Sequence, residues 1–208
     1  MSQPSNSEST YTDWREQVRD GLTPLQNSLT PLFEETRLFR IYSSTLMPGL
    51  LQTEGYAAAV LRAVVTELQE LPFDDSTEAA RARVERSRVI HEPGRRFALL
   101  VEEAVLYHQL GSTQAMADQL DHLLTADSMP SMSLGVIPTA RERSHLPQET
   151  FHVYDEGLVS VELVSAEVKI TQPSDIAQYL RVFEQLRSIA VYGTEARALI
   201  LKAREALR

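Results

Sequence analysis

The sequence contains no cysteine among its 208 residues, which excludes disulfide bonds, thiolate nucleophiles and cysteine metal sites. It has no apolar run near the roughly 20 residues that cross a bilayer. Its first ten residues also lack the basic and apolar segments of a secretion signal. We therefore expect a soluble, cytoplasmic protein that is not attached to a membrane.

Positive charge is also scarce. Lys and Arg total 20 against 29 Asp and Glu, so the formal net charge is -9. Affinity for nucleic acid depends on clustered positive charge, and we expect no direct nucleic-acid binding by this chain alone. The local exception is an arginine-rich stretch at 81–96, which is either a solvated helix face or a docking site for an acidic partner.

The common catalytic and cofactor motifs are missing. There are only eight glycines, and none forms a phosphate-binding loop, a dinucleotide fingerprint or a nucleophile elbow. The five histidines show no metal-ligand spacing; they are His91, His108, His122, His145 and His152. The sequence predicts no metal and no cofactor.

The length and the 43% hydrophobic content suit one compact domain. Residues 1–10 are polar and rich in serine, and are predicted to be a disordered tail. Residues 11–208 form the domain, which opens with a helical lead-in over 11–37 that Pro24 and Pro31 divide into short helices.

The rest of the domain divides by periodicity. Residues 38–130 are predicted to be mainly helical, with Thr53 capping a helix at 54–65, Ser112 capping another at 112–126, and short strands at 38–43 and 97–101. Alternation predicts a strand meander over 131–171 with a hairpin turn at 155–157, and two closing helices over 173–207. The expected fold is a single α+β domain with N-terminal and central helices, a small, mostly antiparallel sheet and two C-terminal helices that cover it.

Four short stretches, in this order and spacing, carry a family resemblance: 47–57, 83–88, 103–106 and 133–138. The chain resembles the C-terminal domain of actinobacterial XRE-type helix-turn-helix regulators, the WhiJ-like group. An Arg-x-x-Arg-Gln pattern of the family is met by Arg83 and Arg86, with Ser87 in place of the glutamine. Its Glu-Ala-x-Leu and Val-x-Pro patterns are met by residues 103–106 and 136–138.

The resemblance implies a domain that binds and does no chemistry, paired with a small partner protein encoded nearby in an antitoxin-like arrangement. In these regulators a DNA-binding module precedes the domain, and the 208 residues contain no such module. A small-molecule ligand is the alternative to the partner protein, and a homodimer is a further alternative.

The candidate binding surface is a groove built around the Pro-Gly turn. Leucines beside an amide at such a turn can anchor a partner segment, so alanine at Leu51 and Gln52 is expected to weaken binding and leave the fold intact. The other interpretation is a rigid corner that only orients the next helix. The predicted groove residues are Met47, Pro48, Gly49, Leu50, Leu51, Gln52, Thr53 and Tyr56, edged by Glu103, with Arg83 and Arg86 beside it.

Two carboxylates have alternative roles. Glu103 either stabilises a helix start, or is partly buried and pairs with Arg83 or Arg86 or contacts a ligand. Glu162 alternates with Val161 and Leu163, which predicts an exposed side chain; if helices cover both sheet faces, it needs an arginine or tyrosine partner.

Three functions follow from these observations. The first is a partner-binding or sensing domain of a WhiJ-like regulator. The second is a small-molecule receptor with its pocket between sheet and helices. The third is a free-standing enzyme of specialised metabolism, with Glu103, Glu162, Tyr56 or His145 as acid-base groups.

Overall fold

The protein was analysed as a computed structural model that describes residues 10–64, 71–143, 146 and 148–207. Its sheet consists of β1 (Thr10–Asp13), β2 (Leu38–Ser43), β3 (Arg96–Glu102), β4 (Met132–Ile137), β5 (Phe151–Tyr154), β6 (Leu158–Glu162) and β7 (Ala166–Ile170). The helices are α1 (Trp14–Gln17), α2 (Leu22–Ser28), α3 (Thr30–Glu35), α4 (Glu54–Ala63), α5 (Ser76–Arg86), α6 (Thr113–Ala126), α7 (Pro173–Ile189) and α8 (Gly193–Glu205). Short 3-10 turns are η1 (Gly49–Leu51), η3 (Ser87–His91) and η4 (Glu103–Tyr107).

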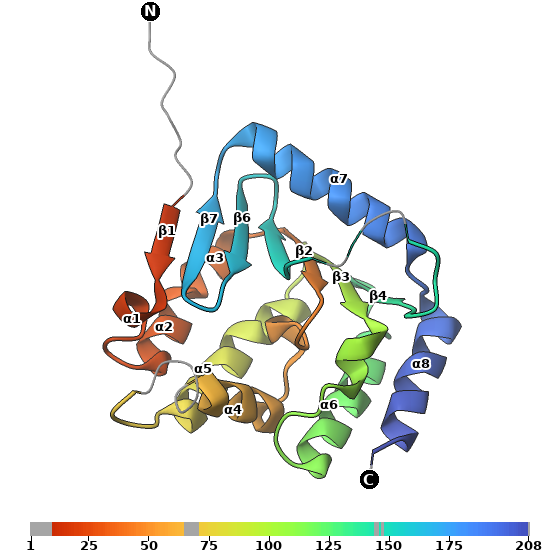
Figure 1. Cartoon of the computed structure of the whole chain (residues 1–208), viewed down its shortest axis with the longest axis horizontal. Helices are drawn as coiled ribbons and strands as arrows, with labels where there is room; N and C mark the ends of the chain where they lie inside the picture. Colours follow the sequence, from red (N-terminus) through yellow and green to blue (C-terminus); the bar gives the residue numbers. More distant parts are fainter. Residues whose placement is uncertain (1–9, 65–70, 144–145, 147, 208) are drawn as a thin grey trace, which may run out of the picture.

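The sheet has seven strands in the order β1-β7-β6-β5-β2-β3-β4 and is mixed (Figure 1). Strands β2, β3 and β4 pair in parallel, while β1, β7, β6, β5 and β2 pair antiparallel. The prediction of a small, mostly antiparallel sheet was therefore wrong. Helices connect β2 to β3 and β3 to β4, and such crossovers return the chain in the same direction. The predicted meander from 131 to 171 is also reduced to β5, β6 and β7, because β4 pairs with β3.

The parallel strands form one end of the sheet, with β4 at its edge. β3 reads Arg-Phe-Ala-Leu-Leu-Val-Glu, an almost continuous apolar run that suits a strand covered on both faces. The short strands predicted at 38–43 and 97–101 are confirmed as β2 and β3. Thr10 begins β1, which pairs with β7, so the predicted helical lead-in opens with a strand. Residues 1–9 of the predicted tail lie outside the described residues.

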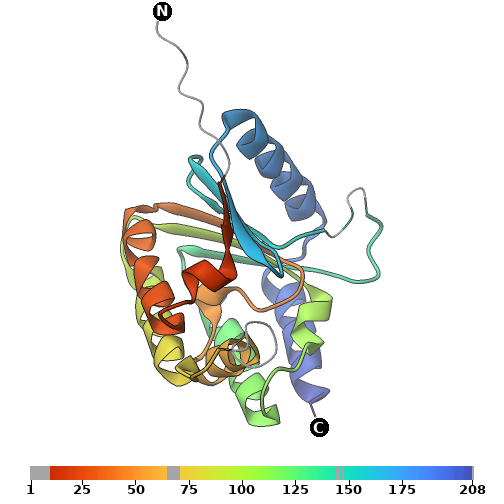
Figure 2. The same cartoon turned by 60° about the vertical axis from the view of Figure 1, so that its left-hand side comes forward.

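Helices cover both faces of the sheet, and Figure 2 shows α7 alone on one side. Beneath α7, the core contains Phe151, Val153, Val159, Val161 and Phe183 among others. The helices that precede β4, together with α8, cover the opposite face (Figure 2). The two closing helices therefore lie on opposite faces, because α8 packs on α6 and β4 while α7 packs on β4, β5 and β6.

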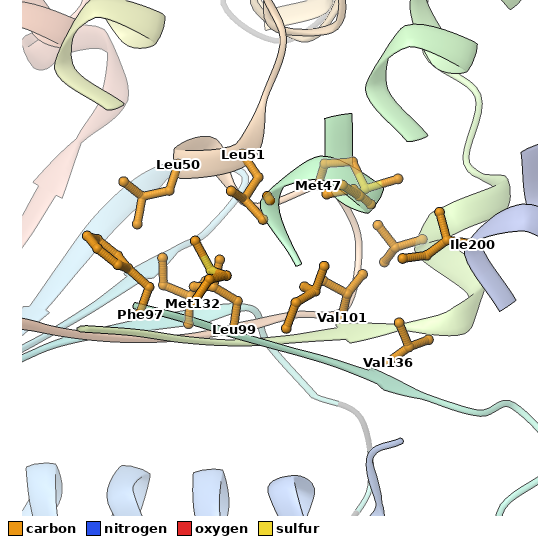
Figure 3. Packing of buried hydrophobic residues seen from close by; sticks show 14 of the residues in the cluster. Met47, Leu50, Leu51, Phe97, Leu99, Val101, Met132, Val136 and Ile200 are labelled. Carbon is orange, nitrogen blue, oxygen red and sulfur yellow. The ribbon is translucent and has the colours of Figure 1, made fainter. Parts of the chain in front are cut away.

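The larger core lies between the sheet and the second helical layer, and Figure 3 shows it from close by. Residues of β3 and β4 point from the sheet toward Met47, Leu50 and Leu51, and Ile200 reaches in from α8 (Figure 3). Met47, Leu50 and Leu51 are each at most 2% exposed. The Pro-Gly turn is consequently a central packing element of the fold.

Candidate functional site

One face of β5, β6 and β7 carries polar side chains although helices cover it. Along these strands the apolar residues point to α7. On the opposite face Tyr154 packs against Phe33 of α3, and the charges of the α5 arginines act on His152 and Glu162. This face carries Leu158 and six residues with polar groups: His152, Tyr154, Ser160, Glu162, Glu167 and Lys169. A covered sheet face normally carries apolar residues, so this polar face requires an explanation.

Two arginines of α5 face these strands. Arg83 donates from Nη1 to Gln52 Oε1 at 2.7 Å and from Nε to Gln26 Oε1 at 3.0 Å. Arg86 donates to the Gln26 carbonyl at 2.5 Å, and its guanidinium lies 4.6 Å from the ring centre of Phe33. Neutral amide groups thus fix both cations in place. We call the two arginines, Gln26, Gln52 and the polar face the Arg83–Glu162 cluster.

Glu162 combines solvent access with desolvation. Its side chain is accessible to solvent, yet the surrounding protein raises the pKa of its carboxyl, with Arg83 acting in the opposite direction. No described side chain or backbone group donates a hydrogen bond to this carboxylate, and none of the described cations lies within 4.0 Å of it.

The neighbouring groups are also perturbed. Burial, together with the charges of Arg83 and Arg86, lowers the pKa of His152 to about 4, while the charge of Glu167 acts in the opposite direction. His152 is therefore neutral at pH 7, with its Nδ1 3.3 Å from the Tyr154 hydroxyl. Burial likewise raises the pKa of Tyr154 and lowers that of Arg86 to about 10.

The cluster has an excess of positive charge. Glu167 accepts from Ser160 Oγ at 2.7 Å and lies 3.3 Å from Lys169 Nζ, so these two charges pair with each other. Arg83 and Arg86 remain, with Glu162 as the one further carboxylate of the cluster. This arrangement leaves one uncompensated cation among desolvated groups, which favours an anion.

Glu162→Gln is expected to stabilise the protein slightly at pH 7 and not at pH 4. A raised carboxyl pKa means that ionisation destabilises the fold as the pH rises above the unfolded value near 4.5. The side chain is solvent accessible, which limits the gain to the order of 0.5 kcal/mol. Urea unfolding of both proteins at the two pH values measures it, and a less stable variant at pH 7 would show that the attraction to Arg83 outweighs desolvation.

The predicted groove around the Pro-Gly turn does not form. Met47, Leu50, Leu51 and Tyr56 are buried in the core, because the turn faces β3 and β4 rather than solvent. Thr53 has the predicted capping role and accepts from the Tyr56 amide at 3.4 Å. Pro48 and Gly49 form the corner that η1 continues, so the rigid-corner interpretation describes this segment.

Gln52 is the exception within this turn. It is 5% exposed, donates to the Met47 carbonyl at 2.8 Å and accepts from Arg83. The amide therefore contacts this chain's own backbone and not that of a partner. It connects the turn to the Arg83–Glu162 cluster.

Glu103 lies apart from this cluster. It begins η4 after β3 and accepts from the Thr139 amide at 2.8 Å, so it stabilises the backbone beyond β4. Three strand spacings separate β3 from β6, which is about 14 Å at 4.8 Å per strand. Glu103, Glu162 and the buried Tyr56 therefore do not form one acid-base site, and His145 lies outside the described residues.

Several residues of the cluster were not predicted from the sequence: Gln26, His152, Tyr154, Glu167 and Lys169. The available signal was the alternation itself, since three successive strands carry residues with polar groups at alternate positions, with Leu158 as the exception. That pattern is typical of a solvated face, and only the position of α2 and α5 shows that this face is covered.

Two further predicted absences concern the described part of the chain. No three of its His, Asp or Glu residues are placed to hold a metal ion. None of its helices is both long and apolar enough to cross a membrane.

A family model described as "Domain of unknown function (DUF5753)" matches residues 32–202. The match covers most of the sequence, and the chain belongs to this family. The family description assigns no activity. No curated protein matches the chain.

Three solved structures are similar in overall arrangement. NucT from Helicobacter pylori is 11% identical with a TM-score of 0.47, over 89% of this chain and 99% of that one. Nuc from Salmonella typhimurium, a phospholipase D family member, is 8% identical with a TM-score of 0.48, over 89% and 97%. The archaeal chromatin protein TrmBL2 is 11% identical with a TM-score of 0.41, over 93% of this chain and 57% of that one. All three TM-scores lie below 0.5, and these likenesses carry no weight for the site or the function.

Proposed function

We propose that this chain is a sensing domain of the WhiJ-like regulator type, and that its ligand is a small anionic molecule bound in the Arg83–Glu162 cluster. The observation that supports this proposal is the excess positive charge in the cluster, next to the accessible carboxylate of Glu162. Occupancy of the cluster would be transmitted as association with a small partner protein. With this proposal we keep the expectation that this chain alone does not bind DNA.

The hydrogen-bonding groups of the cluster define the ligand further. Arg83 has five N–H donors, and its two described partners are neutral amides, which leaves donors for an anionic group. Glu162 accepts hydrogen bonds when ionised, and requires a donor such as a hydroxyl or an ammonium. The favoured ligand therefore carries a carboxylate or phosphate and, close to it, a hydrogen-bond donor.

The cluster is anchored to segments that could transmit occupancy. Arg83 contacts Gln52, and Gln52 contacts the Met47 carbonyl at the buried turn. A ligand that draws the Arg83 guanidinium away from Gln52 would leave a buried amide without its partner, which costs free energy. The turn and the helix that follows it are thus coupled to the site.

An enzyme remains the second candidate, and the contact between His152 and Tyr154 favours it. A histidine held neutral at pH 7 can accept a proton, and Glu162 has a raised carboxyl pKa nearby. Turnover of a ligand captured from the host, lost in His152→Gln, would support this candidate.

The test is native capture from the host followed by mass spectrometry of bound small molecules and proteins. We expect an anionic compound with wild type, and its loss by at least about tenfold in Arg83→Gln and Glu162→Gln, because charge-assisted contacts are removed. Arg81→Gln is the matched control, since Arg81 lies on the same helix and is solvated beside Glu54.

Glu162→Gln keeps the test interpretable if Arg83→Gln fails to fold, because no described group depends on the Glu162 carboxylate for a hydrogen bond. Equal recovery of the compound by wild type and by both cluster variants would exclude the site. A wild-type eluate without any enriched anion would exclude the ligand class.

A further inference from the structure

A cavity of about 320 Å³ lies beneath α7, on the face of the sheet opposite to the Arg83–Glu162 cluster. Tyr42, Phe151 and Ile170 of the sheet form one wall, and Tyr179 of α7 forms another. The volume falls at the lower end of the range for small-molecule sites, about 300 to 1,000 Å³. We call this space the α7 cavity.

The walls of the α7 cavity are aromatic. Phe151 packs against Tyr42 with ring centres 5.5 Å apart, and edge-to-face against Tyr179 at 5.0 Å. Tyr42 and Phe151 are at most 3% exposed, so the sheet wall is fixed by packing. Aromatic walls of this kind bind apolar groups and stabilise cations over their faces.

The charged groups at the cavity are all acidic. Glu149 and Asp175 line it, and none of the described lining residues is lysine, arginine or histidine. Glu149 accepts from the Tyr179 hydroxyl at 2.8 Å, and both carboxylates contribute to raising the pKa of that hydroxyl, behind burial as the main cause. Arg143, whose charge acts on Tyr42, is bound by two hydrogen bonds to Glu102.

Neither carboxylate of the cavity has a cation of its own. Over the ranges that the structure describes, no lysine, arginine or histidine nitrogen lies within 4.0 Å of Glu149 or Asp175. Two carboxylates and a tyrosine hydroxyl around an aromatic cavity provide several acceptors in a small space. The three N–H donors of a primary ammonium group match this arrangement, and its apolar body matches the rings.

We propose that the α7 cavity binds a small primary amine in its protonated form, with the ammonium between Glu149 and Asp175 and the apolar part against Tyr42, Phe151 and Tyr179. The site is independent of the Arg83–Glu162 cluster, because the sheet separates the two and their charges are opposite. An anion is excluded from the α7 cavity by the same acidic groups that favour the amine.

The test uses 2-phenylethylamine as the probe and 2-phenylethanol as its neutral analogue of similar shape. Titration of wild type at pH 7, followed by calorimetry or by NMR shifts of α7 residues, should show that the amine binds at least about tenfold more tightly. Glu149→Gln should weaken binding of the amine by about tenfold, since the glutamine still accepts from Tyr179 but carries no charge. Binding of the neutral analogue should not change.

Glu184→Gln is the matched control, because it removes one negative charge from α7 at an exposed position beside Arg187. It should leave binding of the amine unchanged. If Glu149→Gln loses its fold by circular dichroism, Asp175→Asn at the exposed first turn of α7 provides the same test. Equal binding of amine and alcohol, an equal effect of Glu184→Gln, or no binding of the amine would each overturn the proposal.

Discussion

Replacing Leu51 by alanine is expected to lower the free energy of unfolding by about 3 kcal/mol, the size typical of a leucine truncated in a well-packed core. Leu51 has 0% exposure and lies among Met47, Leu99 and Leu120 in the larger core. Its carbonyl also accepts from Gln119 Nε2 at 2.6 Å, and the Gln119 Oε1 accepts from the Thr53 amide at 2.8 Å. Packing and a buried amide together hold this segment, which limits the collapse of the cavity that alanine would leave.

The measurement is urea unfolding at pH 7 with Leu201→Ala as the control. Leu201 is 45% exposed on α8, so the same substitution there should cost less than about 1 kcal/mol. The expectation drawn from the sequence was the reverse, a fold left intact by alanine at this turn. A Leu51→Ala protein within 1 kcal/mol of wild type would restore that groove interpretation.

The helix caps and the hairpin turn were predictable because each of them depends on neighbouring residues. Thr53 and Ser112 cap α4 and α6 as expected, since a side-chain oxygen satisfies free amides near a helix start. The hairpin between β5 and β6 also turns at Asp155, which adopts a positive φ of 53°. The residues that determine each cap or turn lie within a few positions of one another, so the sequence predicts these features directly.

The sheet order was not predictable in the same way. A strand such as β3 carries no local mark that says whether its neighbours run parallel or antiparallel to it. The parallel pairing with β2 and β4 follows from how the intervening helices pack, over contacts far apart in sequence. The predicted fold class was wrong at this step, because it assumed a small, mostly antiparallel sheet.

Prediction of the Arg83–Glu162 cluster required the same information about contacts far apart in the sequence. Arg83, Gln26 and Glu162 belong to three segments, and each is unremarkable where it stands in the sequence. The arginine was identified from a family pattern, and Glu162 was assigned a partner only if both faces of the sheet were covered. The Glu162 side chain is exposed, as its alternation with Val161 and Leu163 predicted, and the charge of Arg83 nevertheless acts on its carboxyl.

Acidification is expected to destabilise the protein through His152. Its pKa lies at about 4 in the fold against 6.5 for an ordinary histidine, because burial and two arginines disfavour the charged ring. Below pH 6.5 the unfolded chain binds a proton at this residue that the folded chain does not, so stability falls with pH until about 4. The difference between the two values corresponds to about 3 kcal/mol.

Comparison of wild type with His152→Gln isolates this contribution, because other titrating groups act equally in both proteins. The variant should lose about 3 kcal/mol less between pH 7 and pH 4 in urea unfolding. Parallel curves for wild type and His152→Gln would show that this imidazole is not desolvated. A bound anion beside Arg83 would reduce the positive field that opposes protonation, so the proposed ligand should also shift this acid transition to lower pH. The pH dependence of wild type therefore measures chiefly the burial of His152, and its change on ligand binding reports the positive charge of Arg83 and Arg86.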